Sequence, residues 1–84
     1  MEAVLLDWKR NHEPDLAGYN VYRSDIMGND YQKRNYSLIT EHRYVDEQAE
    51  EGRTYYYVVT AVNASGEESK YSNEIEVTIR RKRK

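Results

Sequence analysis

Apolar residues recur at every second position in most segments of this chain, and this spacing limits the fold more than any other feature. The pattern is clear at Val4–Trp8 near the start and at Ile75–Ile79 near the end. Side chains of a β-strand point alternately to opposite faces, so this period is typical of strands with one buried face. No window of about ten residues has helical spacing. The pattern therefore predicts an all-β chain.

Short runs with the composition of strands alternate with polar turns along the chain. The predicted strands cover residues 4–8, 18–24, 31–34, 44–46, 54–63 and 73–79. The longest of them is rich in aromatic and β-branched residues, which favour strands. Several short strands separated in this way are typical of a β-sandwich with Greek-key connections.

The size and composition restrict how such a sandwich is stabilised. The 84 residues suffice for one domain, which at this size buries about 60–65% of the surface of its unfolded chain. The chain has no cysteine, so neither a disulfide nor a thiolate metal site contributes. Phenylalanine is also absent, and nine tyrosines with one tryptophan supply the aromatic bulk. A tyrosine ring can be buried while its hydroxyl reaches water or backbone, which suits a thin sandwich.

The charge is distributed unevenly. The net charge is −2, but the last five residues, Arg80, Arg81, Lys82, Arg83 and Lys84, are all basic. We therefore divide the chain into a domain of residues 1–79 and a disordered basic tail of residues 80–84. The tail could contact a polyanion such as nucleic acid or acidic lipid, begin a linker, or be an engineered end. No stacking aromatics or basic face accompany it, so the sequence disfavours nucleic acid as a partner.

Five motifs, in their order along the chain, resemble strands B, C, E, F and G of a fibronectin type III domain of the bacterial or archaeal type. The motifs are Val4-x-Leu6-x-Trp8, Asp15-Leu16-Ala17-Gly18-Tyr19-Asn20-Val21-Tyr22-Arg23-Ser24, Tyr44-Val45-Asp46, the run from Gly52 to Asn63, and Gly66-Glu67-Glu68-Ser69 with Tyr71-Ser72-Asn73-Glu74. The resemblance covers residues 3–79 and implies an immunoglobulin-like β-sandwich with Greek-key topology. The family opens with a strand A that this chain lacks, so we expect one open sheet edge.

The resemblance also implies roles for individual residues. The expected core consists of Trp8, Tyr19, Val21, Tyr55, Tyr57 and Val59. Among them, Trp8 would be the central aromatic, and the hydroxyl of Tyr55 would bond nearby backbone as a tyrosine corner. Two positions depart from the family: Ala49 stands where leucine is common, and Arg34 stands where an apolar residue is common.

The outward phase of two strands forms the candidate interface. Tyr22, Tyr56, Val58 and Val62 are expected to lie side by side on one sheet face. An exposed patch of this kind can mark a contact site. The alternative is that a neighbouring domain or a folded-over loop covers it.

Nothing in the sequence indicates catalysis. His12 and His42 lie in polar loops, and no strained serine motif stands beside either of them. We expect no metal and no cofactor. No stretch approaches the roughly 20 apolar residues that a membrane helix needs.

We therefore expect a non-catalytic spacer or protein-interaction module of a larger multidomain protein. The resemblance to modules of secreted carbohydrate-active enzymes and surface proteins implies an extracellular or cell-surface location. The expected partners are neighbouring domains, another protein, or a second copy bound through the open sheet edge. Two alternatives stay open: an engineered or excised fibronectin-type scaffold, and a polyanion-binding protein acting through residues 80–84.

Overall fold

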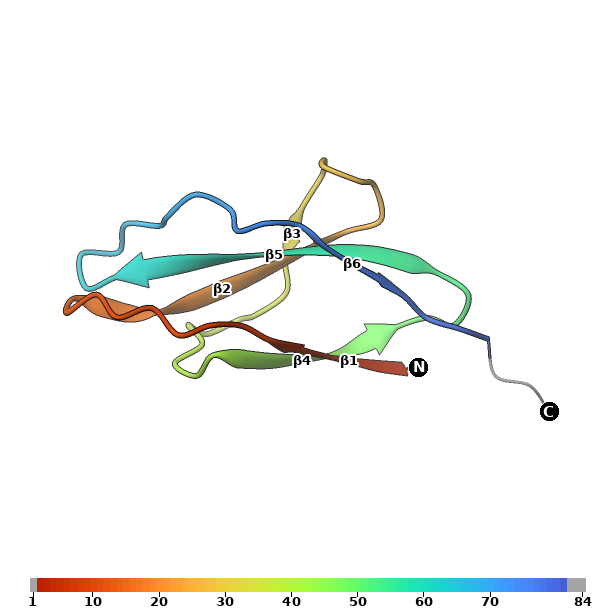
Figure 1. Ribbon diagram of the computed structural model, residues 1–84, viewed down its shortest axis with the longest axis horizontal. Helices are drawn as coiled ribbons and strands as arrows, with labels where there is room; N and C mark the ends of the chain where they lie inside the picture. Colours follow the sequence, from red (N-terminus) through yellow and green to blue (C-terminus); the bar gives the residue numbers. More distant parts are fainter. Residues whose placement is uncertain (1, 82–84) are drawn as a thin grey trace.

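The computed structural model describes residues 2–81 and arranges them in two antiparallel β-sheets (Figure 1). The strands are β1 (Glu2–Asp7), β2 (Leu16–Ser24), β3 (Gln32–Lys33), β4 (Arg43–Ala49), β5 (Thr54–Asn63) and β6 (Ile75–Thr78). One sheet has the order β1-β4 and the other the order β3-β2-β5-β6. Within the described range there is no helix. The prediction of an all-β fold is confirmed.

The chain crosses between the sheets at three connections, β1–β2, β3–β4 and β4–β5. The hairpin-like connections β2–β3 and β5–β6 stay within the larger sheet. The three crossings place the two sheets in opposite layers of one domain, as in the predicted sandwich. The molecule is elongated, with extents of 49, 23 and 21 Å.

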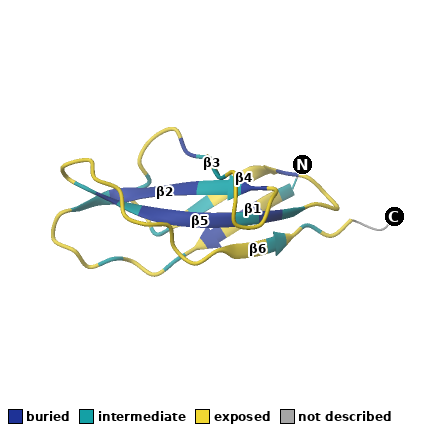
Figure 2. Ribbon diagram, turned by 90° about the horizontal axis from the view of Figure 1, so that it is seen from above, coloured by how far each residue is buried: buried dark blue, intermediate teal, exposed yellow. Residues whose placement is uncertain are grey.

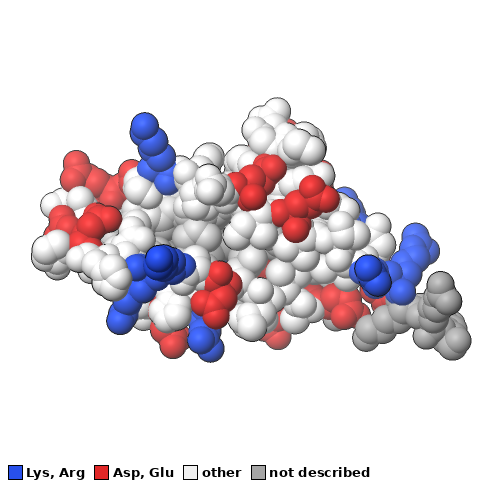
Figure 3. Space-filling model, viewed as in Figure 1, with Lys and Arg blue, Asp and Glu red and all other residues white. Residues whose placement is uncertain are grey.

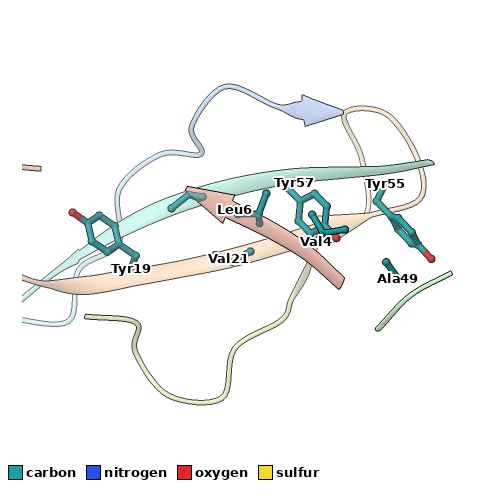
Figure 4. Close-up of a cluster of buried hydrophobic side chains, with 8 residues drawn as sticks. Val4, Leu6, Tyr19, Val21, Ala49, Tyr55 and Tyr57 are labelled. Carbon is teal, nitrogen blue, oxygen red and sulfur yellow. The ribbon is translucent and has the colours of Figure 1, made fainter. Parts of the chain in front are cut away.

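The core lies between the sheets and is built from the inward phase of the strands (Figure 4). In the larger sheet, Val21 pairs with Val59 and Tyr19 with Ala61 across β2 and β5. The buried cluster comprises Val4, Leu6, Tyr19, Val21, Ala49, Tyr55, Tyr57 and Val59. Period-two alternation therefore places these side chains on the inner face.

The crossing from β4 to β5 forms the tyrosine corner that the family resemblance implies. The Tyr55 hydroxyl accepts a hydrogen bond from the backbone N–H of Glu50 at 2.9 Å. Ala49, directly before it, is fully buried. Gly52 follows at the turn with φ +81°, in the left-handed region that glycine enters without steric cost.

Trp8 differs from its expected role, because it is not the central aromatic of the core. β1 ends at Asp7, so Trp8 lies just beyond the strand and is only half-buried. Its backbone N–H donates to the carbonyl of His42, and its indole packs edge-on against Tyr19 at 5.3 Å. The fully buried Tyr57 lies at the centre instead.

All predicted strands except residues 54–63 differ from the observed bounds by one to three residues at an end, and two of these differences have a visible cause. β4 continues to Ala49, because the Asp46 carboxylate accepts the backbone N–H of Gln48 and the pairing with β1 shifts register near Glu2. β6 begins only at Ile75, because the preceding residues run beside β5 without forming a regular ladder.

Candidate interaction surfaces

The predicted interface residues lie on the outer face of the β3-β2-β5-β6 sheet. Tyr22 is paired with Val58, and Tyr56 and Val62 occupy the same phase of β5. However, Val58 is 2% and Val62 8% exposed, while Tyr22 and Tyr56 are half-buried. The expectation that these four residues form an exposed patch is therefore wrong for the two valines. Figure 2 shows the buried stretches of β2 and β5.

The covering element is residues 64–74, the connection between β5 and β6. Ser69 donates its N–H to the Ala61 carbonyl at 2.8 Å, and its hydroxyl accepts the Ala61 N–H at 2.9 Å. Ser72 makes the same two bonds to Val59, both at 2.9 Å. The serine hydroxyls thus accept the β5 N–H groups that the backbone carbonyls of a regular neighbouring strand would accept. These bonds hold the irregular segment along β5 (Figure 1).

Glu68 fastens the segment across the outer face. Its carboxylate accepts hydrogen bonds from Asn20 at 3.2 Å and from the hydroxyls of Tyr22 and Thr60. The hydroxyl of Thr60, followed by that of Tyr22, holds the pKa of Glu68 below its ordinary value. Burial and the bond to Glu68 in turn raise the pKa of Tyr22 to about 12.

A second group of contacts extends this arrangement. The ring of Tyr71 packs edge-on against Tyr22 at 5.3 Å and against Tyr31 at 5.1 Å. The Tyr31 hydroxyl donates to Glu74, which raises the pKa of Tyr31 to about 12. We call Tyr22, Tyr31, Tyr71, Glu68 and Glu74 the tyrosine–carboxylate cluster. Of these residues only Tyr22 was expected at an interface, because the contacts among them join segments distant in sequence.

A buried carboxylate joins the two sheets. Asp46 on β4 is 2% exposed and accepts the Tyr57 hydroxyl at 2.7 Å and the Arg23 guanidinium at 2.8 Å. Burial alone would raise the pKa of Asp46, but the hydrogen bonds from Tyr57, Gln48 and Arg23 outweigh it and the pKa is lowered. Arg34 stands where an apolar residue is common in the family. Its guanidinium lies 3.6 Å from the same carboxyl and places a second positive charge beside it.

The smaller sheet has no comparable cover in the described part of the chain. Leu5 on β1 and Val45 on β4 are paired in register on its outer face, and they are 63% and 46% exposed. Within residues 2–81 no strand pairs with the other side of β1, which matches the open edge that the family resemblance implies.

A groove of about 360 Å³ lies elsewhere, beside the end of β1 and along β5, where Trp8, Tyr19 and Ala61 form part of its wall.

Both histidines lie outside the strands, among polar neighbours. His42 Nδ1 lies 3.2 Å from Asp7 and 3.1 Å from the Trp8 carbonyl, and His12 is exposed. No group of His, Cys, Asp and Glu in this range could hold a metal ion. The same range contains no helix long and apolar enough to cross a membrane.

The basic tail is described only in part. Arg80 and Arg81 are exposed, and the Arg81 side chain lies over the turn at Gly52. Lys82, Arg83 and Lys84 lie outside the described residues, so the disordered tail stays a prediction. Figure 3 shows basic side chains near the end of the described chain and acidic ones over the middle of that face.

Comparisons with known proteins connect this fold to modules of long proteins. No family model matches the chain. An amylopullulanase of Thermoanaerobacter thermohydrosulfuricus is 45% identical over 60 residues, which are 71% of this chain and 4% of the enzyme. The striated-muscle M-protein of Gallus gallus is 36% identical over 78 residues, 89% of this chain and 5% of that protein. The chain thus spans about one-twentieth of these curated relatives.

A solved structure gives a match over nearly the whole chain. The crystal structure of an Fn3-like protein from Clostridium thermocellum superposes with a TM-score of 0.78 at 32% identity. The superposition covers 99% of this chain and 82% of that protein. Likeness in sequence and fold over this length exceeds what a shared sandwich architecture alone requires. The chain therefore belongs to the Fn3-like family, whose fold is the fibronectin type III β-sandwich.

Proposed function

We propose that this chain is a non-catalytic accessory module of a larger multidomain protein and acts through contacts with neighbouring domains or with another protein. The main support is that the same module matches one-twentieth of an amylopullulanase and of a muscle M-protein. An amylopullulanase and a muscle M-protein share this unit. The unit therefore supplies a fold and a surface, and it does not account for the activity of either protein.

The chemistry of the described residues supports a non-catalytic role. A general acid or base works best when its pKa is near the working pH. The pKa values of Asp46 and Glu68 are lowered, and those of Tyr22 and Tyr31 are raised to about 12. Burial together with the bond to Glu68 moves the pKa of Tyr22 away from neutrality, and hydrogen bonds within the fold do so for the other three groups.

The test is an assay of the 84-residue chain on pullulan, starch and β-glucans, with reducing ends as the readout. We expect no hydrolysis and a reversible, cooperative thermal unfolding of the chain by itself. Hydrolysis that disappears when the chain is unfolded would overturn the accessory role. Retention on heparin that is lost on deleting residues 80–84 would favour the polyanion-binding alternative.

An extracellular location is part of the proposal. Its support is the resemblance to modules of secreted enzymes, together with the amylopullulanase match. Antibody labelling of intact cells that express the full-length protein checks it. Labelling that appears only after the cells are permeabilised would contradict it.

A further inference from the structure

The free edge of β1 presents a defined set of backbone groups. Trp8 donates its N–H to the His42 carbonyl at 3.0 Å, so the backbone of Trp8 points toward β4. Backbone groups of a strand alternate in direction, and those of Ala3, Leu5 and Asp7 therefore point away from β4. Within residues 2–81 no strand pairs with this side of β1. Three residues thus offer unpaired donors and acceptors at an edge.

Residues 3–6 of β1 carry none of the features that block pairing at a sheet edge. Natural edge strands are blocked by lysine, proline, a bulge or a covering segment. The residues between Glu2 and Asp7 are Ala-Val-Leu-Leu, with neither lysine nor proline. The register shift near Glu2 places its additional residue on β4, so β1 itself continues regularly.

We infer that β1 pairs with β1 of a second copy, antiparallel and around a two-fold axis at Leu5. Hydrogen-bonded pairs must bring outward-pointing groups together, so odd-numbered residues can only face odd-numbered residues. Of the registers that satisfy this condition, the one with a two-fold axis at Leu5 pairs all three outward-pointing residues, with Ala3 of each copy opposite Asp7 of the other. The exchange gives about six backbone hydrogen bonds, two for each facing pair.

The same condition removes the main electrostatic objection. A register with Glu2 opposite Asp7 would place like charges in contact, which destabilises a sheet. That register joins an even to an odd position and is excluded by the direction of the backbone groups. In the allowed register Asp7 faces alanine, and it already lies 3.2 Å from His42 and 3.8 Å from Arg43 of its own copy.

The exposed apolar pair of the smaller sheet becomes part of this interface. Leu5 and Val45 are neighbours across β1 and β4. Pairing of two copies places them in one row, Val45-Leu5-Leu5-Val45, across the combined sheet β4-β1-β1-β4. Neighbouring apolar side chains on one sheet face stabilise pairing. The interface remains small, so we expect a weak dimer that dissociates on dilution.

Cysteine pairs test both the association and its register. The chain has no cysteine of its own, so any disulfide reports an introduced pair. Facing residues of a hydrogen-bonded pair have Cα atoms about 5.5 Å apart, within disulfide range. Under mild oxidation Leu5→Cys should cross-link with itself. Ala3→Cys and Asp7→Cys should not do so alone, and a mixture of the two should cross-link.

Val45→Cys is the matched control. Residue 45 is also exposed on the same face, but in the dimer two strands lie between it and residue 45 of the other copy. If it or Ala3→Cys cross-links as fast as Leu5→Cys, the inferred register is wrong. Light scattering of the unmodified chain over a concentration series supplies the second measurement. A monomer up to about 1 mM would overturn the proposal, since even weak edge pairing should populate a dimer there.

Leu5→Pro separates pairing from folding. Proline at this position removes only an N–H that points away from β4, so the contact with β4 should persist. We expect a folded monomer with thermal unfolding close to that of the unmodified chain. A Leu5→Pro chain that is folded and still dimeric would contradict pairing through this edge.

Discussion

The outer faces of the two sheets carry similar apolar residues, but one face is covered and the other is exposed. Val58 on β5 and Val45 on β4 both lie at outward positions of a strand, yet they are 2% and 46% exposed. The difference comes from residues 64–74, which return along β5 and fasten themselves with Glu68 and Tyr71. No described segment returns over β4. Alternation thus decides which face a side chain occupies, and the course of the following connection decides whether that face is covered.

The largest expected contrast is between Val58→Asp and Val45→Asp. A carboxylate at position 58 would be buried without a partner, and we expect a loss of about 4 kcal/mol in the free energy of unfolding. The same change at position 45 should cost less than about 1 kcal/mol, because the side chain is half in water. Urea unfolding of both variants measures the difference. Equal losses at the two positions would show that the outer faces do not differ in cover.

Much of the scaffold was predictable from local sequence. The strand predicted at residues 54–63 coincides with β5, because ten residues of aromatic and β-branched character leave little choice. The inner positions Tyr19, Val21 and Tyr57 are also buried. These features depend on alternation within one strand and on its neighbour in the sheet, and both are encoded locally.

The covered face was not predictable in the same way. Residues 64–72 show no strand periodicity, and the family resemblance implied only a turn and the start of strand G there; the path of such a segment depends on contacts distant in sequence. Glu68 reaches Asn20, 48 positions away. Asp46 with Arg23 was missed for a related reason, since a charged residue at an inward position is normally assigned to the surface.

A smaller contrast separates Glu68→Ala from Glu47→Ala. Loss of the Glu68 carboxylate leaves Asn20, Tyr22 and Thr60 without their shared acceptor. Because Glu68 is exposed to solvent, water replaces part of the lost bonding, and we expect about 1 kcal/mol of destabilisation. Glu47 lies exposed on the open face, and its removal should change stability by less than about 0.5 kcal/mol. A loss at position 47 as large as at position 68 would contradict the proposed fastening.

Acid should weaken the same fastening. The pKa of Glu68 and that of Asp46 are lower in the folded chain than their ordinary values. A lowered folded pKa gives stability that is present above the unfolded value near pH 4 and is lost as the pH falls through the folded value. The free energy of unfolding should therefore fall from about pH 5 downward.

The variant Glu68→Gln isolates the contribution of Glu68 to the loss of unfolding free energy in acid. The variant should be less stable than the unmodified chain at neutral pH, and the gap should narrow below about pH 4, where Glu68 itself becomes protonated. Denaturant unfolding at a series of pH values measures the gap. A gap that stays constant into acid would mean that the Glu68 charge plays no part in holding the segment.

The smallest effect concerns the tyrosines of the covered face. Burial and the bond to Glu68 raise the pKa of Tyr22 to about 12, and the bond to Glu74 raises that of Tyr31 to about 12. The ultraviolet absorbance of these two phenolates should therefore rise near pH 12 as the pH increases.

Single substitutions assign this rise. Tyr22→Phe and Tyr31→Phe should each remove absorbance from the rise near pH 12. A raised tyrosine pKa contributes stability that is present below pH 10 and is lost as the pH rises through the folded value, so stability should not vary with this titration near neutral pH and should fall in strong alkali. If the Tyr22 signal moved to lower pH in Glu68→Ala, the carboxylate would be identified as a group that, beside burial, raises the pKa of this phenol.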